Sequence, residues 1–101
     1  MDNLGNELQN AIRALEQVSE HAEAHSDVVY ELLDQLYQQK VDLVNASPHT
    51  ATPNYKAAAE AMRTAAFKVK AAQRDKNHLA DALRTVSDAT GKLNRLLDHA
   101  T

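Results

Sequence analysis

The sequence contains no cysteine and no tryptophan, and only two glycines and two prolines occur among its 101 residues. The absence of cysteine excludes disulfide bonds and thiolate-bound metal ions. Three tyrosines and one phenylalanine are the only aromatic residues, so the residue types that favour strands and tight turns are scarce. The strong helix formers Ala, Leu, Gln, Glu, Lys and Arg dominate instead. This composition predicts an all-α protein with long helices.

The chain also lacks a long apolar run. No segment approaches the roughly 18 apolar residues of a transmembrane helix, so we expect no membrane contact. The N-terminal residues Met-Asp-Asn-Leu-Gly-Asn-Glu have neither the basic nor the apolar region of a Sec signal peptide. We therefore expect a cytoplasmic protein or, as an alternative, a protein secreted without a Sec signal.

Only one segment interrupts the helical pattern. Residues 45–54 hold both prolines together with Ser, Thr and Asn, which is the composition of a turn. We expect a single helical domain over residues 1–101, with two helices at about 3–46 and 53–99 and a turn at 46–53. Thr52 precedes Pro53 as a helix cap does, and Asp2 or Asn3 provides a cap for the first helix.

Each predicted helix carries an apolar stripe whose steps alternate between three and four residues, as in a left-handed coiled coil. In the first helix the stripe contains Leu8, Ala11, Leu15, Val18, Ala22, His25, Val29, Leu32, Leu36, Gln39 and Leu43. In the second it contains Tyr55, Ala58, Met62, Ala65, Val69, Ala72, Lys76, Leu79, Leu83, Val86, Thr90, Leu93 and Leu97.

Folding the chain at the turn predicts an antiparallel hairpin about 65 Å long at about 1.5 Å per residue. The stripes interlock where residue numbers add to 101, which pairs Leu8 with Leu93, Leu15 with Val86, Val29 with Ala72 and Leu36 with Ala65. Residues 1–46 carry nine acids and two bases, whereas residues 53–101 carry nine bases and five acids. This charge asymmetry favours two arms lying side by side.

A hairpin of two helices rarely buries enough apolar surface to be stable alone. A second set of apolar residues lies outside the predicted seam and near the turn: Val28, Tyr30, Leu33, Tyr37, Val41, Val44 and Phe67. We interpret these as an interface through which two hairpins form a homodimeric four-helix bundle. Two alternatives remain. The surface docks onto another helical protein, or the arms bend near residues 25–27 and 75–77 and the chain closes into a compact four-helix monomer.

Two histidines, His21 and His25, have the helical spacing of one ligand pair. The hairpin register sets Lys76 opposite His25, with Asp75 and His78 nearby. Because a lysine disfavours a metal ion there, we interpret His25 and Lys76 as a polar layer that fixes the register and responds to pH. A metal site at His21, His25 and His78 is the weaker interpretation, and we predict no cofactor.

The second arm contains a basic run, namely Arg63, Lys68, Lys70, Arg74 and Lys76. We expect these residues to pair with the acidic first arm, so nucleic-acid binding is an alternative that we do not favour. No phosphate-binding loop, dinucleotide fingerprint or nucleophile elbow occurs. We therefore expect a non-catalytic protein that assembles with itself or with a helical partner.

The turn at Ser47-Pro48-His49-Thr50-Ala51-Thr52 joins two helices in a chain of about 100 residues. This layout resembles, in architecture alone, the small W-x-G hairpin proteins of type VII secretion. The W-x-G motif itself is absent, and the one Tyr-x-x-x-Asp sequence, Tyr30 to Asp34, lies in the first helix and not after the second. The resemblance implies a small secreted hairpin protein as a further alternative.

Overall fold

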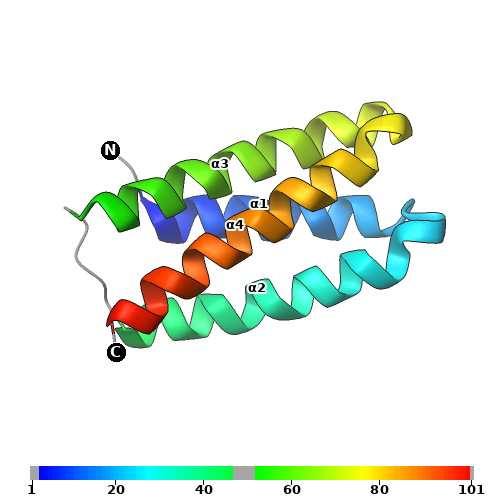
Figure 1. The fold of residues 1–101 in the computed structure, drawn as a ribbon. Coiled ribbons are helices and arrows are strands. Elements are labelled where there is room, and N and C mark those ends of the chain that lie inside the picture. The colour runs from blue at the N-terminus through cyan, green and yellow to red at the C-terminus, as the bar shows by residue number, and fades with distance from the viewer. Residues whose placement is uncertain (1–2, 47–51, 101) are drawn as a thin grey trace.

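The computed structural model describes residues 3–46 and 52–100, except for the side chains of residues 99 and 100. In this part the secondary structure is all helical, and the helices run back and forth along one long axis (Figure 1). The α-helices are α1 (Leu4–Ser19), α2 (Ser26–Ala46), α3 (Pro53–Arg74) and α4 (Leu79–Ala100), with the 3-10 helices η1 (Glu23–His25) and η2 (Lys76–His78) between them. No described helix is both long enough and apolar enough to cross a membrane.

The two continuous helices predicted for residues 3–46 and 53–99 are each broken into two. The breaks lie at residues 20–25 and 75–78, close to the positions of the bent-chain alternative. The fold therefore measures 37 × 22 × 17 Å, whereas the predicted hairpin would be about 65 Å long. A two-helix hairpin leaves apolar surface in contact with water. When both arms fold back, the chain covers this surface itself. The two-helix prediction is thus corrected to four helices.

Each break has its own local geometry. At the first, Glu23 has a φ of 50°, in the left-handed region that residues with a Cβ atom rarely occupy. At the second, Asp75 is extended, and its Oδ1 accepts a hydrogen bond from the backbone N–H of Asn77 at 3.0 Å. Lys76 Nζ joins the two breaks by an ion pair with Glu23 Oε1 at 2.9 Å. Neither break contains glycine or proline, so the sequence marks both only weakly.

We expect Glu23→Gly to stabilise the fold relative to Lys76→Ala, because glycine adopts a positive φ without a steric penalty. Both variants lose the same ion pair, which is exposed and adds little stability. The difference between them then reports the backbone at residue 23 and should be about 1 kcal/mol in favour of Glu23→Gly. Urea denaturation of both variants measures it. Equal stabilities would show that the left-handed conformation carries no strain.

The neighbours of each helix differ from those of the predicted hairpin. α1 packs against α2 and α3, and α4 packs against α2 and α3. The pairs α1 with α4 and α2 with α3, which the hairpin register made direct neighbours, instead lie diagonally across the bundle (Figure 1). Residues such as Leu8 and Leu93 therefore share a core without belonging to adjacent helices.

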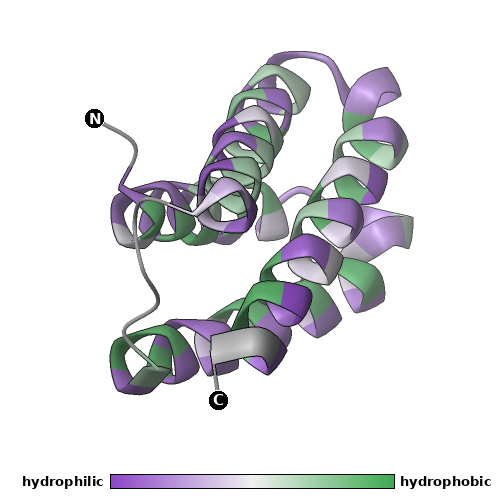
Figure 2. Ribbon diagram, turned by 60° about the vertical axis from the view of Figure 1, so that its left-hand side comes forward, coloured by the Kyte–Doolittle hydropathy of each residue, from purple (hydrophilic) through white to green (hydrophobic). Residues whose placement is uncertain are grey.

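The predicted stripes form most of the core. Every stripe residue is buried except His25 and Leu43, which are half-buried, and Lys76, which is exposed. Hydrophobic and hydrophilic sides alternate around the helices in Figure 2. Further buried residues flank the stripes: Leu4, Ile12, Ala14, Leu33, Ala59, Ala66, Ala82, Ala89 and Leu96. They are buried because each helix has two neighbours in the bundle, which widens its apolar face.

The helix starts agree with the predicted caps. Asn3 Oδ1 accepts a hydrogen bond from the N–H of Asn6, and Thr52 Oγ1 accepts one from the N–H of Tyr55, both at 3.2 Å. The buried hydroxyl of Tyr55 accepts the N–H of Leu4 at 3.0 Å, which fixes the start of α1 beside the start of α3. α2 ends at Ala46 and α3 begins at Pro53, as predicted, and residues 47–51 of the turn lie outside the described residues.

Candidate interaction surface

Exposed large apolar side chains are concentrated on one helix. Six such residues occur in the described part of the chain, and five of them belong to α2. They are Val28, Tyr30, Tyr37, Val41 and Val44 on α2, and Phe67 on α3. Contiguous apolar surface on a small protein commonly marks an interaction site.

Four of the α2 residues form one stripe. Tyr30, Tyr37, Val41 and Val44 are separated by seven, four and three residues, so they lie on the same side of the helix. We call this set the α2 face. Val28 lies outside it, because it borders a groove that α2 shares with Leu83 and other residues of α4.

Leu33 and Phe67 do not belong to this surface, although the sequence grouped them with it. Leu33 is only 5% exposed and lies in the core, so its side chain is unavailable to a partner. Phe67 is 72% exposed, but it is on α3, diagonally opposite α2. Leu33 is buried because α2 has two neighbouring helices, which widens its buried face. Phe67 lies apart from the α2 residues because α3 is diagonal to α2.

Polar contacts connect the margin of the α2 face to α1. The Tyr37 hydroxyl donates a hydrogen bond to Glu16 Oε2 at 2.6 Å, and this bond raises the pKa of Tyr37 above its usual value. Lys40 Nζ donates to Gln9 Oε1 at 2.6 Å. Both contacts are exposed, so they orient α2 on α1 and add little stability.

A buried polar residue lies on the other side of α2. Gln39 occupies a stripe position, and its Nε2 donates to the Thr90 carbonyl oxygen at 2.9 Å and to Asn94 Oδ1 at 2.8 Å. Its Oε1 is buried and has no hydrogen-bond partner in the described part of the chain. A buried, half-satisfied amide weakens packing relative to an apolar residue. Consistently, α2 has less extensive interfaces with α1 and α4 than α3 has with the same helices.

The three histidines considered as metal ligands, His21, His25 and His78, do not converge on a site in the described part of the chain. His21 and His78 are exposed and His25 is half-buried at the end of η1. Among the described residues, no group of three or more potential ligands is positioned to hold a metal ion. The weak metal prediction for His21, His25 and His78 therefore lacks the geometry it requires.

The predicted polar layer of His25 and Lys76 is not a buried layer in the fold. Lys76 is exposed on η2 and pairs with Glu23, and this hydrogen-bonded ion pair lowers the pKa of the Glu23 carboxyl. The layer presupposed a continuous seam, and the seam breaks at both residues. The buried polar position is Gln39 beside Thr90, which the same heptad count includes.

The basic run divides between two environments. Lys68 pairs with Asp81 of α4 at 3.3 Å, and Lys76 pairs with Glu23. Three other members of the run are exposed around Phe67. Arg63 is four residues before it, Lys70 is three residues after it and Arg74 is seven residues after it. They therefore share its side of α3. The helical spacing of these basic residues around Phe67 can be read from the sequence, but the sequence analysis grouped Phe67 with the apolar residues near the turn.

Comparison with known protein families gives no match, and comparisons with characterised proteins and with solved structures give none either.

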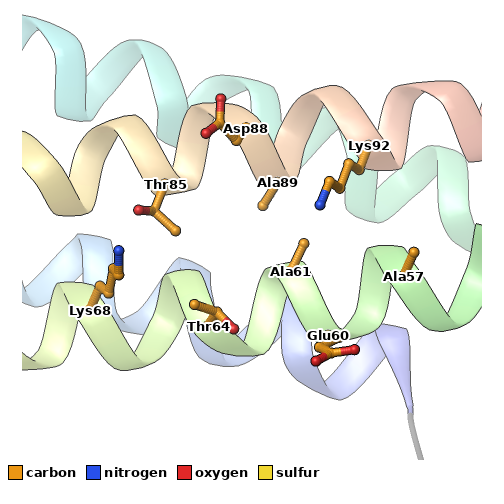
Figure 3. A pocket seen from close by; sticks show the side chains of 9 residues that line it. All are labelled: Ala57, Glu60, Ala61, Thr64, Lys68, Thr85, Asp88, Ala89 and Lys92. Carbon is orange, nitrogen blue, oxygen red and sulfur yellow. The ribbon is translucent and has the colours of Figure 1, made fainter.

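A shallow groove between α3 and α4 contains the alanines Ala57, Ala61 and Ala89 (Figure 3). Lys68 and Lys92 extend toward it from opposite helices, whereas the carboxylates of Glu60 and Asp88 point away. Its lining contains no histidine and no buried acid, so it holds no evident acid–base pair. The small side chains allow α3 and α4 to pack closely, and we assign no ligand to the groove.

Proposed function

We propose that the protein is a non-catalytic helical interaction module that self-associates through the α2 face. The observation that carries this proposal is that four of the six exposed large apolar side chains of the described residues lie on one side of one helix. The same helix has the least extensive packing among the four α-helices, so a partner on its outer side would bury apolar surface that the fold leaves exposed.

The aromatic residues of the α2 face support the same function. Tyr30 is 55% exposed, and tyrosine combines a large apolar ring with a polar hydroxyl, a combination that is enriched in protein interfaces. The face extends over about 21 Å of helix, from Tyr30 to Val44. A helical partner of different sequence is the alternative occupant of this surface.

The remaining predicted functions have less support. The resemblance to W-x-G hairpin proteins depended on a layout of two long helices, and the fold has four. The described histidines do not assemble into a metal site. Both alternatives therefore lose the structural feature on which they were based.

The test is the molar mass of the protein in solution as a function of concentration. We expect the mass measured by light scattering to rise above 11.1 kDa for the wild type as the concentration increases through the micromolar range. The double variant Tyr30→Ser/Val41→Ser is expected to remain monomeric, because it removes two of the four apolar side chains of the α2 face. Sedimentation velocity provides an independent measurement.

Val28→Ser is the matched control, because it shortens an exposed apolar side chain on the same helix but outside the α2 face. It should associate like the wild type. A wild type that remains monomeric at the highest accessible concentration would overturn self-association. The same loss of association in Val28→Ser and in the double variant would show that the α2 face is not the specific contact.

A further inference from the structure

The fold places its charges at opposite edges of the bundle. α2 contains four acids and one base, and α3 contains five bases and one acid. These two helices are diagonal to each other, so the bundle does not bring their opposite charges into contact. The ion pair between Glu23 and Lys76 joins the two arms, but α2 and α3 themselves are not packed against each other.

The exposed side of α3 has an aromatic residue surrounded by cations. Phe67 is flanked on the same side of the helix by Arg63, Lys70 and Arg74, with Ala71 beside it. No acid in the described part forms an ion pair with Lys70 or Arg74. We call Arg63, Phe67, Lys70 and Arg74 the α3 face.

The α2 face is bordered by acids, whereas the α3 face is bordered by bases. Asp34 is four residues after Tyr30 and three before Tyr37, and Asp27 is three residues before Tyr30, so both acids border the apolar stripe. Glu16 of α1 borders it at Tyr37. Both faces thus combine exposed apolar side chains with charges, and the charges have opposite sign.

We propose that the α2 face of one copy docks on the α3 face of a second copy. This inference rests on the proposed self-association and specifies its geometry. Each face offers an aromatic or branched apolar centre to the other, and the acids around Tyr30 meet the bases around Phe67. Arginine and lysine over a tyrosine ring add a cation–π attraction.

The position of the two faces determines the kind of assembly. Because they lie on diagonal helices, a copy bound through its α2 face still exposes its own α3 face on the opposite edge. The contact is therefore heterologous, and repeated docking generates a chain of copies or a closed ring, not a symmetric dimer.

Both faces are small, and their size indicates modest affinity. The α2 face covers about 21 Å of helix from Tyr30 to Val44, and the α3 face covers about 16 Å from Arg63 to Arg74. One helix face buries less than the roughly 800 Å² per partner of a stable complex, so we expect association in the micromolar range or weaker. Salt should weaken it further, because the flanking charges are exposed.

Mixing two variants tests the geometry. Tyr30→Ser/Val41→Ser removes the α2 face and retains the α3 face, whereas Phe67→Ser/Lys70→Glu does the reverse. All four substituted side chains are exposed, so both variants should fold, which circular dichroism verifies. Each variant alone is expected to remain monomeric, and an equimolar mixture is expected to form a 1:1 complex of twice the monomer mass. Wild-type mass should continue to rise beyond that of a dimer.

The outcomes distinguish this inference from the function on which it rests. If Phe67→Ser/Lys70→Glu dimerises like the wild type and the mixture forms no mixed complex, the contact is α2 to α2. The inference then fails and self-association stands. A wild type that remains monomeric removes both. A further outcome is a monomeric wild type that is retained on single-stranded DNA. If that retention is lost in Phe67→Ser/Lys70→Glu and in high salt, the α3 face binds nucleic acid, which also overturns the inference.

Discussion

Replacing Leu33 with aspartate is expected to abolish stable folding. The side chain is 5% exposed and belongs to the apolar core. An unpaired carboxylate in such a position costs several kcal/mol, and a domain of this size has a total stability of about 5–15 kcal/mol. Circular dichroism and a thermal melt measure the effect, as a loss of the cooperative transition or a large decrease in Tm.

Val41→Asp is the matched control for this prediction. It introduces the same residue into the same helix at an exposed position of the α2 face. We expect it to leave the fold within about 0.5 kcal/mol of the wild type while it weakens self-association. If Leu33→Asp instead melts like the wild type and only loses self-association, Leu33 is an interface residue, as the sequence pattern had indicated.

Truncating Ile12 to alanine is expected to destabilise the fold by about 2–5 kcal/mol. Ile12 flanks the heptad stripe and would border solvent in a two-helix hairpin, but in the bundle it is 2% exposed. The loss combines the transfer of the removed methyl and methylene groups with the cavity that they leave. Urea denaturation with a linear extrapolation gives the change in unfolding free energy.

Val44→Ala is the comparison for Ile12→Ala, since it truncates a branched apolar side chain that is 73% exposed. We expect it to change stability by less than about 0.5 kcal/mol. An Ile12→Ala variant as stable as Val44→Ala would contradict the four-helix packing and would favour the extended hairpin.

Together these pairs of variants separate folding from assembly. Leu33 and Ile12 report the core, whereas Tyr30, Val41 and Phe67 report surfaces that the fold leaves uncovered. The distinction matters because all of these residues are apolar and the sequence alone gives no direct measure of their exposure. Only the arrangement of neighbouring helices assigns each one to the interior or to the surface.

Several features of the fold were predictable from the sequence, and for identifiable reasons. The clustering of Pro48 and Pro53 with small polar residues predicted the single long interruption, and α2 and α3 end and begin at the expected residues. The caps at Asn3 and Thr52 followed from side chains that compete for free backbone N–H groups. These signals are local, so they do not depend on how the helices pack.

The two breaks were harder to predict. Glu23 adopts a left-handed conformation that its residue type disfavours, and the heptad stripe continues through both breaks without a change of spacing. The sequence indicated an extended and a bent chain, and the bent-chain alternative placed its bends near residues 25–27 and 75–77, close to the observed breaks at residues 20–25 and 75–78. Asp75, whose side chain accepts the N–H of Asn77, was the strongest local indication of the second break.

The sequence by itself determined that the protein is helical, which residues form the centre of its core and where the long turn lies, because helical periodicity and turn chemistry are encoded over a few neighbouring residues. Only the tertiary structure decided that each arm folds back, that Leu33 and Ile12 are buried, and that the acidic α2 and the basic α3 lie diagonally apart. Those properties depend on which helices become neighbours, and the same apolar stripe satisfies a long hairpin and a compact bundle equally well. The surface available for assembly is therefore a consequence of the packing and not of the pattern.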